Sequence, residues 1–281
     1  MHVILVCIDN FQEHILINIK QLIRLNHDSI FVITNSKFFD LFDEFKNNIV
    51  LVNCDTLKES YNYRPNTNYF DTKFRNGFWG LTSKRFFLIH SFMKQRNLTD
   101  VFHIENDVLL YHNCDILTPN IDRSRLCVPA DSYNRSIASI IFIPTCDLLG
   151  SFLDSYVDKY NDMENLSYAQ QIKPQLFDNF PICIDLLDHN PVQKYVTRDF
   201  KKFNMIFDAA AIGQYLGGVD PRNIPGDTKG FVNETCVIKY DQFEFIWQQS
   251  GNFRRPFMKF DELSIPIFNL HIHSKNLAEF I

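Results

Sequence analysis

Two acidic residues and an amide interrupt an apolar stretch near the middle of the chain. Glu105, Asn106 and Asp107 lie between the largely apolar runs 101–104 and 108–111. Alternate residues of an extended chain lie on one side, so both carboxylates would face the same way. Carboxylates at the end of a buried strand are costly unless a cation is present. Because oxygen ligands of this kind suit Mg²⁺ or Mn²⁺, the pattern predicts a divalent-cation site, with a solvated turn as the simpler alternative.

A second group of reactive side chains lies near the end of the chain. If the segment 266–275 is a strand, His271, His273 and Lys275 share one face of it. A neutral imidazole can bind Mn²⁺, and a lysine ammonium is a point charge suited to phosphate. A single histidine is usually a core or surface residue, but three such side chains on one face favour a functional site. We prefer His271 to His273 as a ligand, because the apolar strand would bury it more deeply.

A third candidate is Asp208, which follows an apolar run and precedes three alanines. This position predicts the N-cap of a helix that ends at Gly217 and Gly218. A loop is expected after that helix, at residues 219–232. Arg222 in this loop is either a substrate contact or an ordinary turn residue.

The elements that would position these residues begin with a β-α-β-α-β pattern. Apolar runs predict three strands, at residues 2–8, 29–35 and 48–55. Apolar residues at helical spacing predict two helices between them, at residues 11–23 and 37–45. This alternation predicts a parallel sheet with right-handed crossovers and ligand contacts at the carboxyl ends of the strands. Asp9, Asn35 and Asp55 follow the three strands, as turn residues or as ligand contacts.

The rest of the chain continues the α/β alternation. A long loop is expected at residues 56–77, followed by a helix at 78–96 that carries Lys84 and Arg85. A lone Lys-Arg pair is usually a solvated cationic face. Three further strands are expected, at residues 100–104, 125–131 and 138–144. The segment 147–190 has a mostly helical pattern.

Composition narrows the class of protein. The 281 residues are 46% hydrophobic and 22% charged, which is sufficient for one large domain. The net charge of −5 has no basic stripe, so no nucleic-acid partner is expected. Seven dispersed cysteines without a CxxC pair indicate reduced thiols in a cytoplasmic protein. We also expect no targeting signal and no transmembrane segment. The sequence lacks the glycine-rich phosphate loop, the dinucleotide turn and the nucleophile elbow.

With this architecture, the segment "HIENDVLLY" resembles the acidic motif of the nucleotide-sugar glycosyltransferases of the GT-A fold. That motif is Asp-x-Asp and follows a Rossmann-like nucleotide-binding half. Here Glu105 replaces the first acid, whereas Asp107 keeps the last, which is usually the direct metal ligand. The resemblance implies an α/β protein with a GT-A-like, Rossmann-type central mixed sheet flanked by helices. It further implies a single domain, 1–281, with a nucleotide-binding half at 1–112 and an acceptor and catalytic half at 113–281.

The resemblance also implies roles for individual residues and for cofactors. The cofactor would be Mn²⁺ or Mg²⁺, and its ligands would be Asp107, His271 and His273. The donor would be a nucleotide-diphosphate sugar, with UDP favoured as the commonest nucleotide of the fold, and its contacts would be Asp9, Lys84, Arg85, Glu105, Asn106 and Lys275. In an inverting transfer Asp208 would be the catalytic base. The acceptor would be a glycan or a lipid-linked sugar.

Two alternative functions remain open on the residues alone. A sugar-phosphate nucleotidyltransferase shares a related sheet, but "CIDNFQEH" lacks the glycine and arginine of the usual N-terminal loop of those enzymes. A non-catalytic nucleotide-sugar-binding module is the other alternative, and the retained Asp107 and terminal histidines argue against it. Trp79 and Trp247 are expected to fill the core rather than stack on a ligand.

Overall fold

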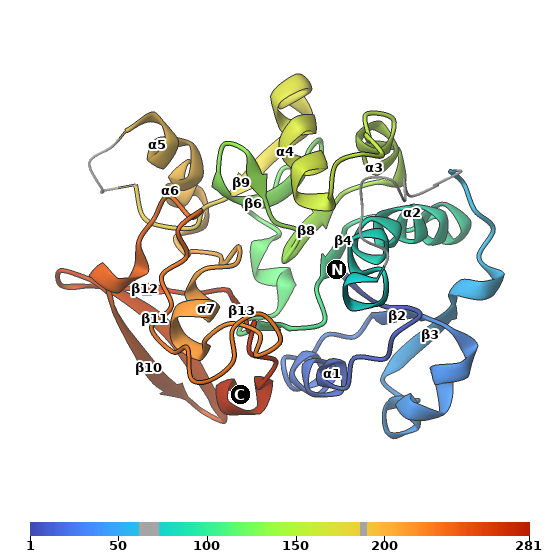
Figure 1. The fold of residues 1–281 in the computed structure, drawn as a ribbon, viewed down its shortest axis with the longest axis horizontal. Helices are drawn as coiled ribbons and strands as arrows, with labels where there is room; N and C mark the ends of the chain where they lie inside the picture. The colour runs from blue at the N-terminus through green and yellow to red at the C-terminus, as the bar shows by residue number, and fades with distance from the viewer. Residues whose placement is uncertain (62–72, 186–189) are drawn as a thin grey trace.

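The computed structural model describes residues 1–61, 73–185 and 190–281 (Figure 1). Residues 62–72 of the predicted loop and residues 186–189 of the predicted helical segment lie outside the described residues. No helix in the described parts of the chain combines the length and hydropathy needed to cross a membrane.

The first part of the chain forms the parallel half of an eight-stranded sheet. Strand β1 pairs in parallel with two neighbours, and β2 pairs in parallel with β3. These four strands are β1 (His2–Cys7), β2 (Ile30–Thr34), β3 (Ile49–Asn53) and β4 (Val101–Ile104). The predicted strands and their parallel arrangement are therefore confirmed.

The second part of the chain makes the sheet mixed. The strand order is β3-β2-β1-β4-β8-β6-β7, and β9 pairs with β6. Strand β8 is antiparallel to β4 and to β6, whereas β9 is parallel to β6. The bounds of these strands are β6 (Leu126–Ser132), β7 (Arg135–Ser136), β8 (Ile140–Ile143) and β9 (Phe177–Phe180). This arrangement confirms the predicted α/β class with a Rossmann-type central mixed sheet.

Strand β9 corrects the mostly helical prediction for residues 147–190. It has four residues, too few to show a periodicity of its own, and it exists because it pairs with β6. The helical prediction is met before β9, by α3 (Cys146–Leu153) and α4 (Asp162–Ile172), whereas the described residues 181–185 and 190 that follow β9 are not helical. The next helix, α5 (Pro191–Thr197), begins after the predicted segment.

Helices cover both faces of the sheet (Figure 1). Helix α1 (His14–Arg24) packs on one face, where its buried apolar side chains meet Val3 and Leu5 of β1. Helix α2 (Phe78–Arg96) packs on the other face, against residues such as Ile4. Because successive side chains of a strand point to opposite faces, one apolar strand supplies both cores.

Shorter helices complete the fold. The predicted helix at 37–45 is a 3-10 helix, η1 (Ser36–Phe45). The remaining α-helices are α6 (Phe200–Phe203) and α7 (Ile212–Gly217). Short 3-10 turns occur at η2 (Cys54–Thr56), η3 (Phe74–Asn76), η4 (Cys114–Leu117), η5 (Pro174–Leu176), η6 (Tyr240–Gln242) and η7 (Leu277–Phe280).

The end of the chain forms two small sheets. Strands β10 (Glu244–Ser250), β11 (Phe253–Phe260) and β12 (Leu263–Pro266) form an antiparallel sheet, on the side of the molecule away from α2 in Figure 1. Strand β5 (Val108–Leu110) pairs separately with β13 (Asn269–His271). The sequence analysis did not predict β10 to β12.

The predicted terminal strand at 266–275 is wrong in its last part. Strand pairing stops at His271, and the N–H of His273 donates a 3.1 Å hydrogen bond to the carbonyl of His271 in a tight turn. Lys275 then has a left-handed backbone with φ of 64°. The three side chains therefore do not share one face of a strand. The turn brings these side chains together, and the alternation of side chains along a strand does not.

Candidate functional site

The β5–β13 pairing brings the two predicted groups of reactive residues together. In this antiparallel pair His271 lies opposite Val108, the residue after Asp107. The N–H of Ile272 also donates a 2.8 Å hydrogen bond to the carbonyl of Asp107. The acidic segment thus lies beside the histidine segment because of a backbone register.

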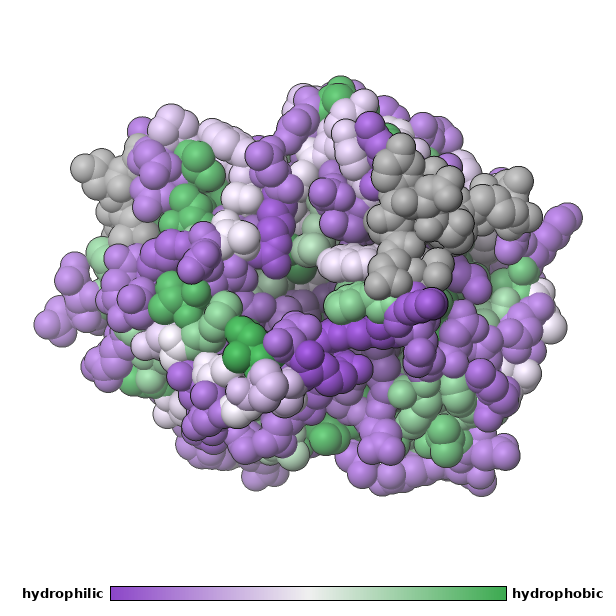
Figure 2. Space-filling model, in the orientation of Figure 1, coloured by the Kyte–Doolittle hydropathy of each residue, from purple (hydrophilic) through white to green (hydrophobic). Residues whose placement is uncertain are grey.

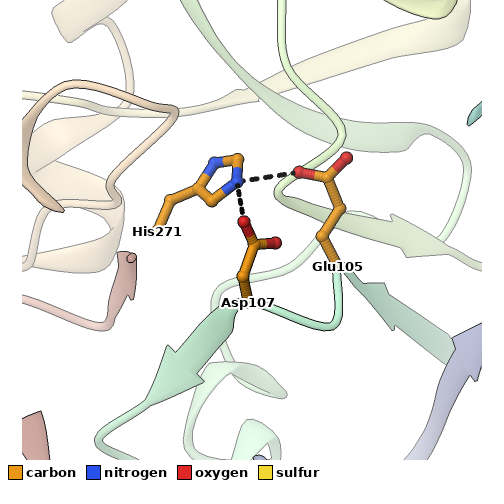
Figure 3. Close-up of side chains that lie close together, drawn as sticks. All are labelled: Glu105, Asp107 and His271. Atoms are coloured by element: carbon orange, nitrogen blue, oxygen red, sulfur yellow. Dashed lines mark ion pairs between the residues drawn. The ribbon is translucent and has the colours of Figure 1, made fainter. Parts of the chain in front are cut away.

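Glu105, Asp107 and His271 form a compact cluster of candidate ligands (Figure 3). The Nε2 atom of His271 lies 3.2 Å from Oε2 of Glu105 and 3.2 Å from Oδ2 of Asp107. The three ligand atoms lie within 4.8 Å of one another. Two carboxylates and an imidazole are a donor set that suits Mn²⁺ or Mg²⁺. The residues present therefore fit the divalent cation that the sequence analysis predicted.

The ring of His271 is held in the orientation that a ligand requires. Its Nδ1 lies 2.9 Å from the carbonyl oxygen of Ala209. A carbonyl can only accept, so Nδ1 carries the proton of that hydrogen bond, and Nε2 is left to face the two acids. A second hydrogen bond that fixes the ring in this way is typical of metal-binding histidines.

Groups of opposite charge lie close together in the cluster. Lys275 forms an ion pair with Oδ2 of Asp107. Burial disfavours the charged form of Asp107, but Lys275 and His271 hold the pKa of its carboxyl well below the ordinary value. Burial also disfavours a charged His271, yet Asp107 and Glu105 raise its pKa to about 9. The protonated imidazole and the lysine ammonium therefore supply the positive charge that the two acids require.

Arg85 lies behind this cluster instead of on a solvated face. It is 7% exposed, forms an ion pair with Oε1 of Glu105, and lies 2.6 Å from Oδ2 of Asp162. Burial opposes ionisation of Glu105, but Arg85 and then His271 lower the pKa of its carboxyl. Arg85 therefore keeps Glu105 charged and fixes its position. Its predicted contact with the nucleotide stays a prediction.

Asn106 lines the cleft with the two acids, and its side chain secures their loop. Its Nδ2 donates to the carbonyl of Val6 at 2.8 Å and to Oε1 of Gln12 at 2.7 Å. Asn18 of α1 donates to the carbonyls of Glu105 and Asn106, at 3.2 Å each. These contacts tie the acidic loop to the end of β1 and to α1. The middle residue thus has a structural role in this conformation.

The cluster opens into a cleft of about 1320 Å³. Glu105, Asp107 and His271 line it, together with Lys275. Its other walls come from the ends of β1 and β4, from the start of α2, and from the segments around α7 and 219–235. Polar side chains predominate on the face of the molecule drawn in Figure 2, with apolar residues in small groups. A cleft of this size accommodates a large ligand beside the cluster.

The polar residues at the ends of β1, β2 and β3 form one network, as the parallel sheet predicts. The N–H of Asp9 donates to Oδ1 of Asn35 at 2.6 Å, and Nδ2 of Asn35 donates to Oδ1 of Asp55 at 2.7 Å. Asp9 lines the cleft, and Lys84 lies 3.7 Å from its carboxylate. Lys84 is absent from the described lining of the cleft. The structure thus brings Asp9 to the cleft and places Lys84 beside it.

Asp208 lies beneath the site and outside the described lining of the cleft. Its buried carboxylate accepts hydrogen bonds from the backbone N–H groups of Ala211, Ile212, Gly213 and His271, at 2.7–2.9 Å. Helix α7 begins at Ile212, later than predicted, because residues 209–211 form bends and not the first turn of a helix. The N-cap position is Ala211, so the predicted position of the cap is wrong, but the carboxylate of Asp208 still accepts from the first N–H groups of the helix. The role of Asp208 as a base stays a prediction.

His273 lies next to the cluster but has a different partner. Its ring centroid is 4.3 Å from that of His271, and its Nδ1 lies 2.9 Å from Nε2 of Gln214. Burial and the nearby His271 lower its pKa well below the ordinary value. Of the two terminal histidines, the one that reaches both carboxylates is His271. His273 is a neutral neighbour in the cleft wall.

The two tryptophans have different surroundings. Trp79 lines the cleft, and its ring stacks on that of Phe74 with the centroids 6.2 Å apart. Trp247 packs against Tyr111 with the centroids 5.7 Å apart and is not among the described residues of the cleft lining.

Two charged residues of the site were not predicted from the sequence. Asp162, at the start of α4, is the second partner of Arg85. Arg75 of η3 reaches across the cleft, where its Nη2 lies 3.2 Å from Oδ2 of Asp220. Arg222 binds the same carboxylate at 2.7 Å. Asp162 follows an ordinary helix N-cap, so its sequence position carries no functional signal.

Comparisons with known proteins add only a general similarity of fold. No protein-family model matches the sequence, and no curated protein matches it. Among solved structures, mouse xyloside xylosyltransferase 1 aligns with 64% of this chain and 84% of its own, at 8% identity and a TM-score of 0.45. The glycosyltransferase GlyE of Streptococcus pneumoniae aligns with 63% of this chain and 44% of its own, at 13% identity and a TM-score of 0.43. A cytidylyltransferase from Leptospira borgpetersenii aligns with 66% of this chain and 77% of its own, at 13% identity and a TM-score of 0.42. At these identities and TM-scores the similarity assigns neither a family nor an activity.

Proposed function

We propose that the protein is a divalent-cation-dependent glycosyltransferase that takes its sugar from a nucleotide-diphosphate sugar. The observation that carries the proposal is the convergence of Glu105, Asp107 and His271 in a cleft, with Lys275 beside them. Mn²⁺ or Mg²⁺ would be held by these three ligands. When bound, the cation supplies positive charge that stabilises the diphosphate leaving group.

The charges of the site explain why cation and donor would bind together. A diphosphate carries two to three negative charges, and the carboxylates of Glu105 and Asp107 would repel it. Lys275 pairs with Asp107 in this structure, and its ammonium is also a suitable partner for phosphate oxygens. Once a cation occupies the acids, Lys275 is free to bind the diphosphate. Donor affinity should therefore depend on the cation.

The remaining residues of the site position these groups. Arg85 holds Glu105, and Asp208 with Ala209 holds His271. The nucleoside would bind at the ends of β1 to β3, beside Asp9, where ligands of such sheets bind. The sugar then passes to a hydroxyl of a glycan or lipid-linked acceptor. The proposed location is the cytoplasm, which agrees with seven free cysteines.

Calorimetric titration tests the proposal. UDP, GDP, CDP and dTDP are titrated into the protein with Mn²⁺ and again with EDTA. At least one of them should bind with Mn²⁺ and lose most of its affinity in EDTA. Asp107→Asn and His271→Ala should abolish this cation dependence, whereas His273→Ala should retain it.

Two outcomes would contradict the proposal. Equal nucleotide affinity in Mn²⁺ and EDTA would leave the acidic segment as a polar turn with no cation. Release of pyrophosphate from a nucleoside triphosphate and a sugar phosphate would instead identify a nucleotidyltransferase. Transfer itself is measured as nucleoside diphosphate released in the presence of sugar acceptors.

A further inference from the structure

One wall of the cleft is a continuous chain of hydrogen-bonded side chains that starts beside His271. The members that line the cleft are His273, Gln214, Asn233, Thr235 and Arg135. We call this set the polar wall. Its first member, His273, has its ring centroid 4.3 Å from that of His271. Its last member, Arg135, is 2.7 Å from Oδ2 of Asp131, which is fully buried.

The direction of every hydrogen bond in the polar wall follows from one backbone group. The N–H of Thr235 donates to Oδ1 of Asn233 at 3.0 Å, so that atom must be the amide oxygen. The Nδ2 of Asn233 therefore faces Gln214 and donates to its Oε1 at 2.8 Å. The Nε2 of Gln214 in turn donates to Nδ1 of His273 at 2.9 Å. Because each amide is fixed by its neighbour, it cannot exchange its donor and acceptor atoms to suit another ligand.

The middle of the polar wall, between His273 and Arg135, carries no charge. Its three members there, Thr235, Asn233 and Gln214, have side chains that do not ionise. The one permanent charge in the set is that of Arg135, and Asp131 pairs with it. The Nε2 of Gln214 also lies 3.4 Å from Nε2 of His273, and the Nδ2 of Asn233 has a second N–H beyond the one that it gives to Gln214. Fixed, uncharged donors and acceptors are the groups that recognise hydroxyls.

We propose that the polar wall binds the sugar ring of the donor and selects an uncharged sugar over an acidic one. This inference rests on the proposed function, because it takes the diphosphate to be held at Glu105, Asp107 and His271. A sugar attached to that diphosphate must lie next to the cluster. In Figure 1, α7, which carries Gln214, lies on the opposite side of the molecule from β2 and β3, where the nucleoside would bind.

The chemistry of the wall makes the selection specific. A hydroxyl can both donate and accept, so it can pair with an amide N–H or with an amide oxygen. The carboxylate of an acidic sugar would need a free cation, and the only cation of this set is engaged by Asp131. Sites that hydrogen-bond a particular group reject ligands that leave buried polar atoms unpaired.

The test compares the affinity of a nucleotide sugar with that of its nucleoside diphosphate. Both are titrated with Mn²⁺, using the base that binds best in the experiment above. The sugars are glucose, galactose, N-acetylglucosamine, xylose and glucuronate, each as the nucleotide conjugate. In the wild type, at least one neutral sugar should bind about tenfold more tightly than the free diphosphate, and the glucuronate conjugate should not.

Two isosteric variants remove members of the wall. Gln214→Met removes the central amide, and Thr235→Val removes the hydroxyl at the far end while keeping its shape. Each should lower the affinity gained from the sugar by about three- to tenfold, the effect of one lost hydrogen bond. The affinity for the free nucleoside diphosphate should stay within twofold. If one variant fails to fold, the other provides the result.

The matched control is Gln170→Met. Gln170 and Gln214 are both 6% exposed, but Gln170 bonds to Ser136 and Tyr195 away from the described cleft lining. This variant should keep the full affinity gain from the sugar. The inference is overturned if the wild type binds glucuronate as tightly as neutral sugars, or if the wall variants weaken the free diphosphate and its sugar conjugate equally. If no nucleoside diphosphate binds with Mn²⁺, the proposed function itself fails.

Discussion

The backbone N–H of His271 donates a 2.8 Å hydrogen bond to Oδ2 of Asp208, from a segment far away in the sequence. The carbonyl of Ala209, the next residue, accepts from Nδ1 of the same histidine. Two adjacent residues thus hold both the main chain and the ring of His271. The aspartate that looked like a helix cap therefore positions the imidazole that faces Glu105 and Asp107.

Asp208→Asn separates this positioning role from that of a catalytic base. Four backbone N–H groups point at the carboxylate, and the NH₂ of asparagine cannot accept from those that face it. We expect the free energy of unfolding to fall by about 2–4 kcal/mol, because hydrogen bonds to a charged group are lost. Nucleotide binding should also lose part of its cation dependence. Chemical denaturation and calorimetry measure the two effects.

Asp40→Asn is the control, since Asp40 is exposed on η1 and should tolerate the change. A different set of results would support Asp208 as the catalytic base. If Asp208→Asn keeps wild-type stability and cation-dependent nucleotide binding but loses transfer, Asp208 acts in the chemistry.

Gly213→Ala tests the close contact between α7 and β13. A Cβ at Gly213 would lie 2.1 Å from the carbonyl oxygen of His271 and 3.0 Å from Oδ2 of Asp208. Both are fixed atoms, so the chain at His271 must shift. We expect a loss of stability of about 2–4 kcal/mol and loss of cation-dependent nucleotide binding.

Gly217→Ala in the same helix is the matched control. There a Cβ would meet the ring of Phe280 at 3.0 Å and the hydroxyl of Ser274 at 3.3 Å, which are side-chain atoms that can move. Gly217→Ala should therefore lower the stability less than Gly213→Ala does. Equal effects of the two substitutions on Mn²⁺-dependent nucleotide binding would show that the tight approach at Gly213 does not hold His271.

Arg85→Gln tests the support of Glu105. The guanidinium is buried between Glu105 and Asp162, so its removal leaves the buried Asp162 without this cation and leaves Glu105 with His271 alone. Breaking a buried pair in this way typically costs about 3–5 kcal/mol. The pKa of Glu105 should rise, so that cation-dependent nucleotide binding weakens at neutral pH and recovers at higher pH.

Lys84→Gln is the neighbouring control. Lys84 is 41% exposed and lies 3.7 Å from Asp9, so its loss should cost less than about 1 kcal/mol. The loss of stability for Arg85→Lys should lie between those for Arg85→Gln and Lys84→Gln, since an ammonium can pair with one acid but not bridge two. A stable Arg85→Gln variant with wild-type nucleotide binding would remove Arg85 from the site.

The fall in stability at acidic pH should depend on histidines outside the site. Burial lowers the pKa of His27 to about 4, and burial lowers that of His112 to about 4 as well. Unfolded histidine titrates near 6.5, so between pH 6.5 and 4 the unfolded chain binds protons that the folded chain does not. Stability contributed by the neutral rings is present above pH 6.5 and is lost as the pH falls. Each ring should contribute a slope of about 1.4 kcal/mol per pH unit in that window.

Denaturation curves at pH 4.5, 5.5, 6.5 and 7.5 measure this slope. A double variant, His27→Gln with His112→Gln, should show a flatter acid limb than the wild type. The Nε2 atoms of both rings lack a partner among the described atoms, so the substitutions break no contact there. An unchanged slope in the double variant would assign acid sensitivity to other groups.

Residue types and local spacing determined the parts of this protein that depend on short stretches of chain. Apolar runs and helical periodicity located β1, β2, β3 and α2, since each element buries several apolar side chains that lie close together in the sequence. Glu105 to Asp107 interrupt an apolar run, and this interruption marked the acidic site. Carboxylates between two buried strands are costly unless a cation lies close to them. Position in the chain also suggested His271. These features are visible without knowing what any residue contacts.

The contacts between distant segments were decided by the tertiary structure. The register of β5 with β13 places His271 beside Asp107, and strand pairing with β6 creates β9 from four residues with no periodicity. The second partner of Arg85 is Asp162, an acid that follows an ordinary helix cap. Hydrogen bonds and ion pairs reach only about 3–4 Å, so they depend on how the whole chain packs. Spacing in the sequence shows which groups could meet, and only the packing of the sheet and helices selects the pairs that do.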